Sequence, residues 1–284
     1  MNEETSFIEE LAEPVAQRVV SKPKKRQKAA MAIAFGILAL AISASLWGTA
    51  EWRGTLSVRR VFVEGNRIVP ANEIVLLTGI TDGAKLYTVD LNQVRENILK
   101  QLYVSSAVVE REFPDAIRIS VEERQPLAAV SHGGTLFLDE EGFVLPHYQS
   151  NTVFDVPFVT GFPESLTITP GQSSTDPSIL YALDILKKAK GLDAELYHLV
   201  SEVHVNESGD VILYSSDAGV TIVFGRENEL QKLGMLRAFW NKFVLQRGAD
   251  RLQIVDLRYG DQIIARWKDS STDHRIAFQK GIDL

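Results

Sequence analysis

The stretch VSSAVVEREFPDAIRISVEERQPLA (residues 104–128) carries the pattern that decides the fold of the region around it. Two strand-like runs, 104–112 and 116–123, flank a Phe-Pro-Asp turn at 113–115. In the second run apolar and polar residues alternate, which is typical of a strand with one buried face. The stretch therefore predicts two adjacent strands joined by a short turn.

A strand and two short helices are predicted upstream of this pair. Residues 58–64 (VRRVFVE) form a strand pattern that ends at a Gly-Asn turn, and Pro70 begins a short helix that ends near Gly79. Asp90 is a favourable N-cap for a second helix. The apolar residues of that helix share one face, which we expect to lie on a sheet: Leu91, Val94, Ile98 and Leu102. The predicted order is a βααββ module.

Beyond residue 125 the apolar runs are shorter and the turns denser, which indicates an antiparallel sheet. One helix is predicted to begin after the N-cap Asp176, with Pro177 at its first position, and to end at Gly191. Another is expected over 227–243. The expected strands are 127–131, 135–139, 143–145, 200–205, 211–215, 220–224, 252–259 and 262–267.

Residues 29–50 (AAMAIAFGILALAISASLWGTA) contain no charged residue. About 20 apolar residues in a helix are enough to cross the hydrocarbon core of a bilayer. Five basic residues lie in the preceding segment 22–28, so the positive-inside rule places the N-terminus in the cytoplasm and the chain after Glu51 outside. Trp47 and Trp52 would then lie near the outer interface. The expected fold class is α+β: a single N-terminal transmembrane helix, the βααββ module, and a mainly antiparallel β domain with helices.

Two other structures fit residues 29–50 less well. A cleaved secretory signal has an apolar core of about 7 to 15 residues and a small-residue cleavage site. Ala39-Leu40-Ala41 offers such a site, but the apolar stretch is longer and 28 residues precede it. A buried helix of a globular domain would carry a polar face, which this stretch lacks. Residues 1–28 are polar with segregated charge and predict a mostly disordered tail.

The composition argues against several classes of function. Lys and Arg number 30 against 37 Asp and Glu, and a net charge of -7 disfavours nucleic-acid binding. The absence of cysteine excludes disulfides, thiolate metal sites and cysteine nucleophiles. No nucleotide-binding, hydrolase or metalloprotease motif occurs. The histidines are scattered, at His132, His147, His198, His204 and His274, and the acidic run Asp139, Glu140 and Glu141 is typical of a solvated turn. We expect no metal, no cofactor, no small-molecule substrate and no catalysis.

Several motifs follow one another in a characteristic order. The first strand contains VFVEGN (61–66), and the Phe-Pro turn is followed by a strand and by EERQPLA (122–128). A Leu-Asp-x-x-Gly motif follows at 138–142, and the chain then has VDLRY (255–259) with Trp267 eight residues later. In this order and spacing the motifs resemble the FtsQ (DivIB) family of bacterial cell-division proteins, whose outer region begins with a POTRA domain.

The resemblance implies a scaffold of the division complex, in the cell inner membrane at the septum. In that family FtsB and FtsL bind by strand addition at the terminal hairpin, which implies Arg258, Tyr259 and Trp267 as contacts here. FtsK, FtsW or FtsI would bind through the POTRA domain and the membrane helix. If 252–259 and 262–267 pair, the last strand lies at or near a sheet edge. The implied segments are a cytoplasmic tail (1–28), the membrane helix (29–50), a POTRA domain (56–125), an FtsQ-type β domain (126–268) and a C-terminal tail (269–284).

Other interpretations stay open at this point. A POTRA-containing export or assembly factor would bind unfolded substrates promiscuously, and an envelope enzyme without a recognisable motif would turn over cell-wall or peptide substrates. Tyr259 and Trp267 are also compatible with simple packing on the sheet, since aromatic residues on terminal strands are commonly structural. In that case Arg258 would be a solvated charge at the edge.

Overall fold

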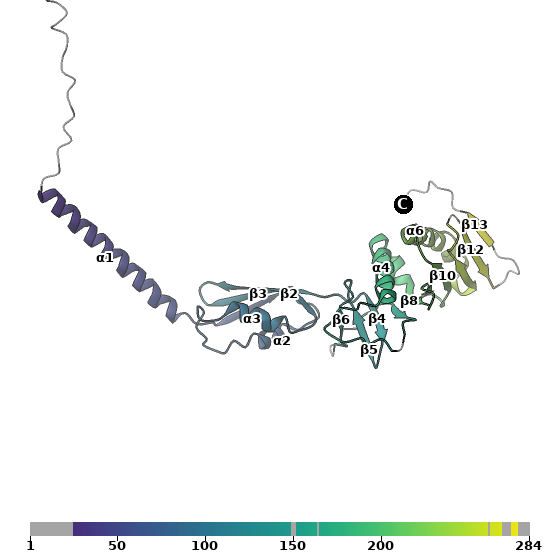
Figure 1. Cartoon of the computed structure of the whole chain (residues 1–284), viewed down its shortest axis with the longest axis horizontal. Helices are drawn as coiled ribbons and strands as arrows, with labels where there is room; N and C mark the ends of the chain where they lie inside the picture. Colours follow the sequence, from purple (N-terminus) through teal and green to yellow (C-terminus); the bar gives the residue numbers. More distant parts are fainter. Residues whose placement is uncertain (1–24, 149–151, 164, 261, 269–273, 278–284) are drawn as a thin grey trace, which may run out of the picture. The chain divides into compact units, whose positions relative to one another are not determined.

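The computed structural model describes residues 25–148, 152–163, 165–260, 262–268 and 274–277, and has a mixed α+β fold (Figure 1). The long helix at the start and the region from Ser57 onward are separate compact units. The predicted fold class is confirmed by the order of the elements. Most of the expected tails, residues 1–24, 269–273 and 278–284, lie outside the described residues.

Helix α1 (Lys25–Thr55) contains the apolar stretch. Its segment Lys28–Trp47, 20 residues long, is long and apolar enough to cross a membrane, and none of it is buried within the protein. Trp47 is exposed on this helix, whereas the side chain of Trp52 lies outside the described residues. A helix without any covering protein surface does not fit the alternative of a buried core helix.

The βααββ module has the predicted element order. Its elements are β1 (Arg60–Glu64), α2 (Ala71–Leu77), α3 (Leu91–Ile98), β2 (Val104–Glu112) and β3 (Ala116–Glu123). Strand β3 lies in the middle, parallel to β1 and antiparallel to β2. The Asp90 carboxylate accepts hydrogen bonds from the main-chain N–H groups of Asn92 and Gln93, so the predicted N-cap is confirmed. Ile74 and Ile98 of the two helices are fully buried in the module's core.

Glu123, at the end of β3, is nearly buried and holds the chain between β1 and α2. Its carboxylate accepts hydrogen bonds from the main-chain N–H groups of Arg67 (2.8 Å), Ile68 (2.7 Å) and Val69 (2.8 Å). Hydrogen bonds to an ionised acceptor are stronger than neutral ones and compensate for its burial. One residue of the motif at 122–128 therefore has a structural role inside this module.

The second region is built on one ten-stranded sheet in the order β13-β12-β11-β10-β9-β8-β7-β4-β5-β6. Most neighbouring pairs are antiparallel, and the parallel ones are β10–β11, β7–β8 and β4–β7. The strands are β4 (Ala128–Ser131), β5 (Thr135–Leu138), β6 (Val144–Leu145), β7 (Phe158–Thr160), β8 (Val200–Val205), β9 (Val211–Ser215), β10 (Thr221–Gly225), β11 (Leu252–Asp256), β12 (Gln262–Trp267) and β13 (His274–Ala277).

Helices pack on this sheet and complete its core. They are α4 (Pro177–Leu192), α5 (Ala194–Leu199), α6 (Glu229–Phe239), a π-helical turn (Trp240–Val244), α7 (Leu245–Arg247) and a 3-10 turn (Ala249–Arg251). The predicted cap of α4 is confirmed, since the Asp176 carboxylate accepts from the N–H groups of Ser178 and Ile179. The predicted apolar face of α4 is also buried, at Ile179, Leu183 and Leu186.

Several boundaries differ from the predictions, for local reasons. Helix α4 continues through Gly191 because the true stop is Asp193, whose side chain also caps the unpredicted helix α5. Helix α6 begins at Glu229 rather than at 227, because Glu227 and Asn228 have φ angles of +62° and +55°. Strand β7 was not expected. Within the expected tail, residues 274–277 form β13.

Candidate docking edge

The terminal hairpin forms as predicted, by antiparallel pairing of β11 with β12. Leu252 lies opposite Trp267, and Asp256 lies opposite Ile264. Strand β12 is second from the end of the sheet, because β13 pairs with its other side. We use the name docking edge for that other side of β12 together with Arg258 and Tyr259 at the hairpin tip.

The side chains of β12 alternate between core and outer face. Ile263 and Ala265 are fully buried, and Trp267 is 6% exposed. The intervening residues are partly or fully exposed, namely Gln262, Ile264 and Arg266. The strand is therefore anchored by its core-facing side, and its outer face carries two polar residues and one apolar residue.

Arg258 is engaged by Asp256 of the same hairpin. Its Nε donates to Asp256 Oδ1 at 3.0 Å and its Nη2 donates to Oδ2 at 2.6 Å, a two-point contact. Burial by itself would raise the pKa of Asp256, but the hydrogen bonds and the charge of Arg258 outweigh it, and the pKa lies below its ordinary value. The same contact raises the pKa of Arg258. More than half of the Arg258 side chain stays exposed, so other N–H groups of the guanidinium can reach a partner.

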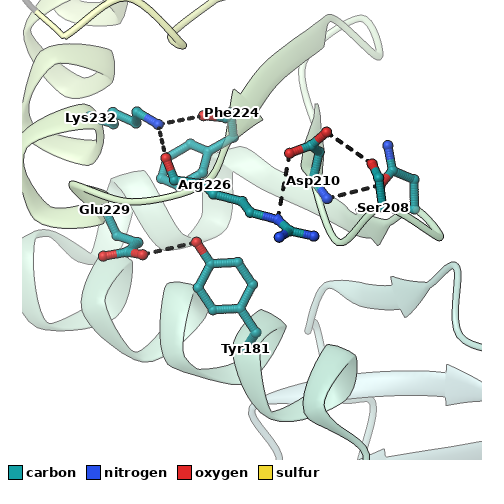
Figure 2. A network of polar contacts seen from close by, with 8 residues as sticks. Tyr181, Ser208, Asp210, Phe224, Arg226, Glu229 and Lys232 are labelled. Carbon is teal, nitrogen blue, oxygen red and sulfur yellow. Dashed lines mark hydrogen bonds and ion pairs between the residues drawn. The ribbon is translucent and has the colours of Figure 1, made fainter.

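Lys232 of α6 is buried, and its side chain reaches the main chain at the end of β10 (Figure 2). Its Nζ donates to the carbonyl oxygens of Phe224 (2.9 Å) and Arg226 (2.6 Å), at the end of β10. Burial lowers the pKa of Lys232, and nearby carboxylates, first Glu229, partly oppose that shift. The two hydrogen bonds tie the end of β10 to α6.

Gly225 allows the side chain of Arg258 to lie against the end of β10. Its φ is +70°, and a Cβ atom at this position would come within 2.9 Å of Arg258 Cγ. A larger residue would therefore push Arg258 away from Asp256. Sequence reasoning missed Lys232 and Gly225, because a lysine within a helix and a glycine after a strand carry no local sign of what packs on them.

Glu229 connects α4 to α6 in the same network (Figure 2). Its carboxylate accepts from the hydroxyl of Tyr181 at 2.9 Å. Burial, and then the hydrogen bond to Glu229, raise the pKa of Tyr181 to about 12. On the other side of the strand end, Arg226 and Asp210 form an ion pair of 3.6 Å. The hairpin thus rests on a helix that is itself held by polar contacts.

Tyr259 lies at the hairpin tip and is 45% exposed. The N–H of Gln262 donates to the Tyr259 carbonyl at 3.3 Å, and the side-chain amide of Gln231 in α6 donates to the Gly260 carbonyl. The turn is therefore held from two sides while the aromatic ring stays largely accessible. The predicted turn residue Asp261 lies outside the described residues.

Trp267 faces the core at the far end of β12. The Arg247 guanidinium lies over its ring, 5.1 Å from the centroid. The indole nitrogen Nε1 is buried and has no hydrogen-bond partner among the described residues. Of the three predicted contact residues, the structure places Arg258 and Tyr259 at the hairpin tip and Trp267 beneath the strand.

The residues considered for metal binding do not come together. Within the described ranges no group of three or more His, Asp or Glu side chains could hold a metal ion. The expectation of a solvated acidic turn was wrong for Asp139, which is 2% exposed. Its carboxylate accepts from Arg124 Nη1 at 2.7 Å and from the N–H groups of Glu141 and Phe143. The partner of this buried charge is an arginine, because the turn folds back onto the start of β4.

Comparison with known proteins identifies both regions that follow the long helix. Residues 56–124 match the family described as POTRA domain, FtsQ-type, and residues 125–266 match the family described as FtsQ/DivIB, C-terminal related. The chain is also 31% identical over 226 residues to the cell division protein FtsQ of an Anaeromyxobacter species, covering 77% of this chain and 76% of the relative. The chain belongs to the FtsQ family.

Other FtsQ proteins match over similar lengths. The cell division protein FtsQ of Geotalea daltonii is 26% identical over 270 residues, which cover 89% of this chain and 96% of the relative. The FtsQ of Rhodothermus marinus is 27% identical over 238 residues, covering 81% and 84%. The resemblance inferred from the motifs is confirmed. The C-terminal FtsQ match ends at Arg266, within β12, so that β13 lies beyond it.

Proposed function

We propose that this protein is a single-pass inner-membrane scaffold of the division complex, which binds FtsB and FtsL through the docking edge. Membership of the FtsQ family supports a role in cell division. The proposed layout is the one expected above: a cytoplasmic tail (1–28), a membrane helix (29–50), a POTRA domain (56–125) and a β domain (126–268) facing outward at the septum, and a C-terminal tail (269–284).

The position of the terminal hairpin carries this proposal. Strand β12 begins at the exposed hairpin tip, lies next to the end of the sheet, and is anchored to the core by Ile263, Ala265 and Trp267. The side of β12 away from β11 can pair with an extended segment through main-chain hydrogen bonds, as it does with β13 here, and pockets and anchors beside it give specificity. Binding of this kind needs no chemistry, and we propose that the protein acts without catalysis.

The three proposed contact residues would act in different ways. The Tyr259 ring supplies exposed aromatic surface of the kind that anchors interfaces. Arg258 would offer a partner carboxylate the N–H groups that Asp256 does not use. Trp267, which is buried, would keep β12 in place from the core side.

A second, weaker surface is proposed on the POTRA domain. Strand β2 is an outer strand of the three-stranded sheet, and Val108 on it is 55% exposed. FtsK, FtsW or FtsI would bind there or along the membrane helix. Because the helix α1 confines all these proteins to one membrane, it would raise their effective concentration.

The test is binding of the full-length protein, in detergent, to purified FtsB and FtsL segments. Tyr259→Ala is expected to weaken the complex by about 2 kcal/mol, a factor of roughly thirty in Kd. Tyr87→Ala is a matched control, because Tyr87 lies in the POTRA domain and is 43% exposed, against 45% for Tyr259. Trp267→Phe, which keeps an aromatic ring in the core, is expected to weaken binding less. Equal affinities of folded Tyr259→Ala and wild type would contradict the proposed edge.

A further inference from the structure

The docking edge is occupied by the chain itself. Strand β13 pairs antiparallel with β12, with Gln262 opposite Ala277, Ile264 opposite Arg275, and Ala265 opposite His274. The pairing covers four residues of each strand and uses the main-chain groups on the side of β12 that faces away from β11. A partner strand proposed to add to β12 would need the same groups.

The opposite end of the sheet is closed in a different way. Val144 of β6 donates its N–H to the Gln172 carbonyl and accepts from the N–H of Gly171, both at 2.9 Å. The N–H of Ser174 donates to the Gly142 carbonyl at 2.8 Å. There the outermost strand is covered by a loop that continues into α4 and the core. Among the strands that the structure describes, β13 instead has a neighbour on one side alone.

An exchange at β12 would replace one set of main-chain hydrogen bonds with an equivalent set. The net free energy of this exchange is therefore small. Which strand pairs with β12 then depends on the covalent link that holds β13 near β12 and on the other contacts of the partner. The described part of β13, His274–Ala277, covers Gln262 to Ala265 of the six-residue strand β12.

We propose that β13 is a built-in occupant of the docking edge, and that a partner's extended segment binds by displacing it from β12. This inference rests on the proposed function. Displacement fits better than addition to the outer side of β13, because β12 continues directly from the tip that carries Arg258 and Tyr259. A partner cannot bind while β13 covers the edge. The apparent affinity is therefore the intrinsic affinity multiplied by the fraction of time that the edge is uncovered.

The test compares the full-length protein with two variants, using the purified FtsB segment as the probe. The first variant ends at Lys268 and so lacks β13. The second carries Ile264→Cys and Arg275→Cys, at positions that lie opposite each other. Since the natural chain has no cysteine, oxidation can join this pair alone. Thr221→Cys with Tyr214→Cys, an opposed pair between β10 and β9, is the matched control for oxidation.

Removing β13 is expected to tighten binding about tenfold, the gain for an edge covered about nine-tenths of the time. The oxidised Ile264→Cys/Arg275→Cys protein is expected to lose binding and to regain it on reduction, whereas the oxidised control pair keeps it. Unchanged affinity in the truncated protein, with full binding by the oxidised first pair, would overturn displacement and leave the proposed function standing. Failure of the wild-type, truncated and reduced proteins to bind at all would overturn both.

Discussion

The two ends of the large sheet differ in what holds them. At the β6 end, the closed end, buried polar groups fix the strands: Asp139 pairs with Arg124, and the hydroxyl of Tyr103 donates to the Pro146 carbonyl at 2.7 Å. At the open end, β12 and β13, the hairpin tip carries the exposed side chains of Arg258 and Tyr259. A sheet with two exposed ends invites uncontrolled pairing. This protein closes one end with a loop that continues into the core, and within the described residues the other end is strand β13.

The largest effect is expected from breaking the closed end. Asp139→Ala would leave Arg124 and two main-chain N–H groups without their acceptor, and we expect a loss of about 3 kcal/mol in the free energy of unfolding. Asp256→Ala at the open end removes a similar contact to an exposed arginine and should lose about 1 kcal/mol. Denaturant unfolding of both variants measures the difference. Equal losses in the free energy of unfolding would mean that the two contacts stabilise the two ends of the sheet equally, against this prediction.

Hydrogen exchange should show a large difference between the ends in the native protein. We expect main-chain amides of β12 that pair with β13 to exchange at least about tenfold faster than those of β5 that pair with β4, because the outermost described strand at that end opens locally. The measurement needs no partner. Similar protection at both strands would show that β13 is as firmly held as the closed end.

Alkaline pH should weaken the closed end. Burial raises the pKa of Tyr103 to about 12, so its ionisation is disfavoured in the folded state. Its stabilising contribution is complete below the ordinary tyrosine pKa near 10 and is lost as the pH rises from there to about 12. Tyr103→Phe should lose about 1 kcal/mol at pH 7, because the hydrogen bond to Pro146 disappears.

Tyr103→Phe should also lose less stability than the wild type between pH 10 and 12. Unfolding measured at several pH values gives this loss. Tyr181 and Tyr197 have pKa values raised to about 12 as well, so a remaining slope is expected. An identical slope in Tyr103→Phe and wild type would contradict the assignment to Tyr103.

The smallest effect is expected at Arg258. Because its side chain is 56% exposed, Arg258→Ala should change the free energy of unfolding by about 0.5 kcal/mol or less. Binding of the FtsB segment should nevertheless weaken, if the guanidinium meets a partner carboxylate. Thermal unfolding and the binding assay together separate these roles, and a loss of stability comparable to that of Asp139→Ala would assign Arg258 to the fold instead.

Local sequence patterns were sufficient for much of the fold. Alternation at 116–123, the N-caps Asp90 and Asp176, and the hairpin of β11 and β12 were all predictable, because each depends on neighbours within a few residues. Helix α5 was missed because the capping residue Asp193 follows a helix directly. The contact residues Arg258, Tyr259 and Trp267 came from the family resemblance, and their roles in binding stay predictions.

The sequence by itself determined the apolar anchor segment, the βααββ order and the family. Periodicity, caps and motif spacing are local properties, and they leave their mark on the residues themselves. Only the tertiary structure decided that Lys232, Asp139 and Trp267 are buried, and that residues 274–277 pair with β12. Burial and strand order depend on segments far apart in the chain, whose contacts no local pattern encodes.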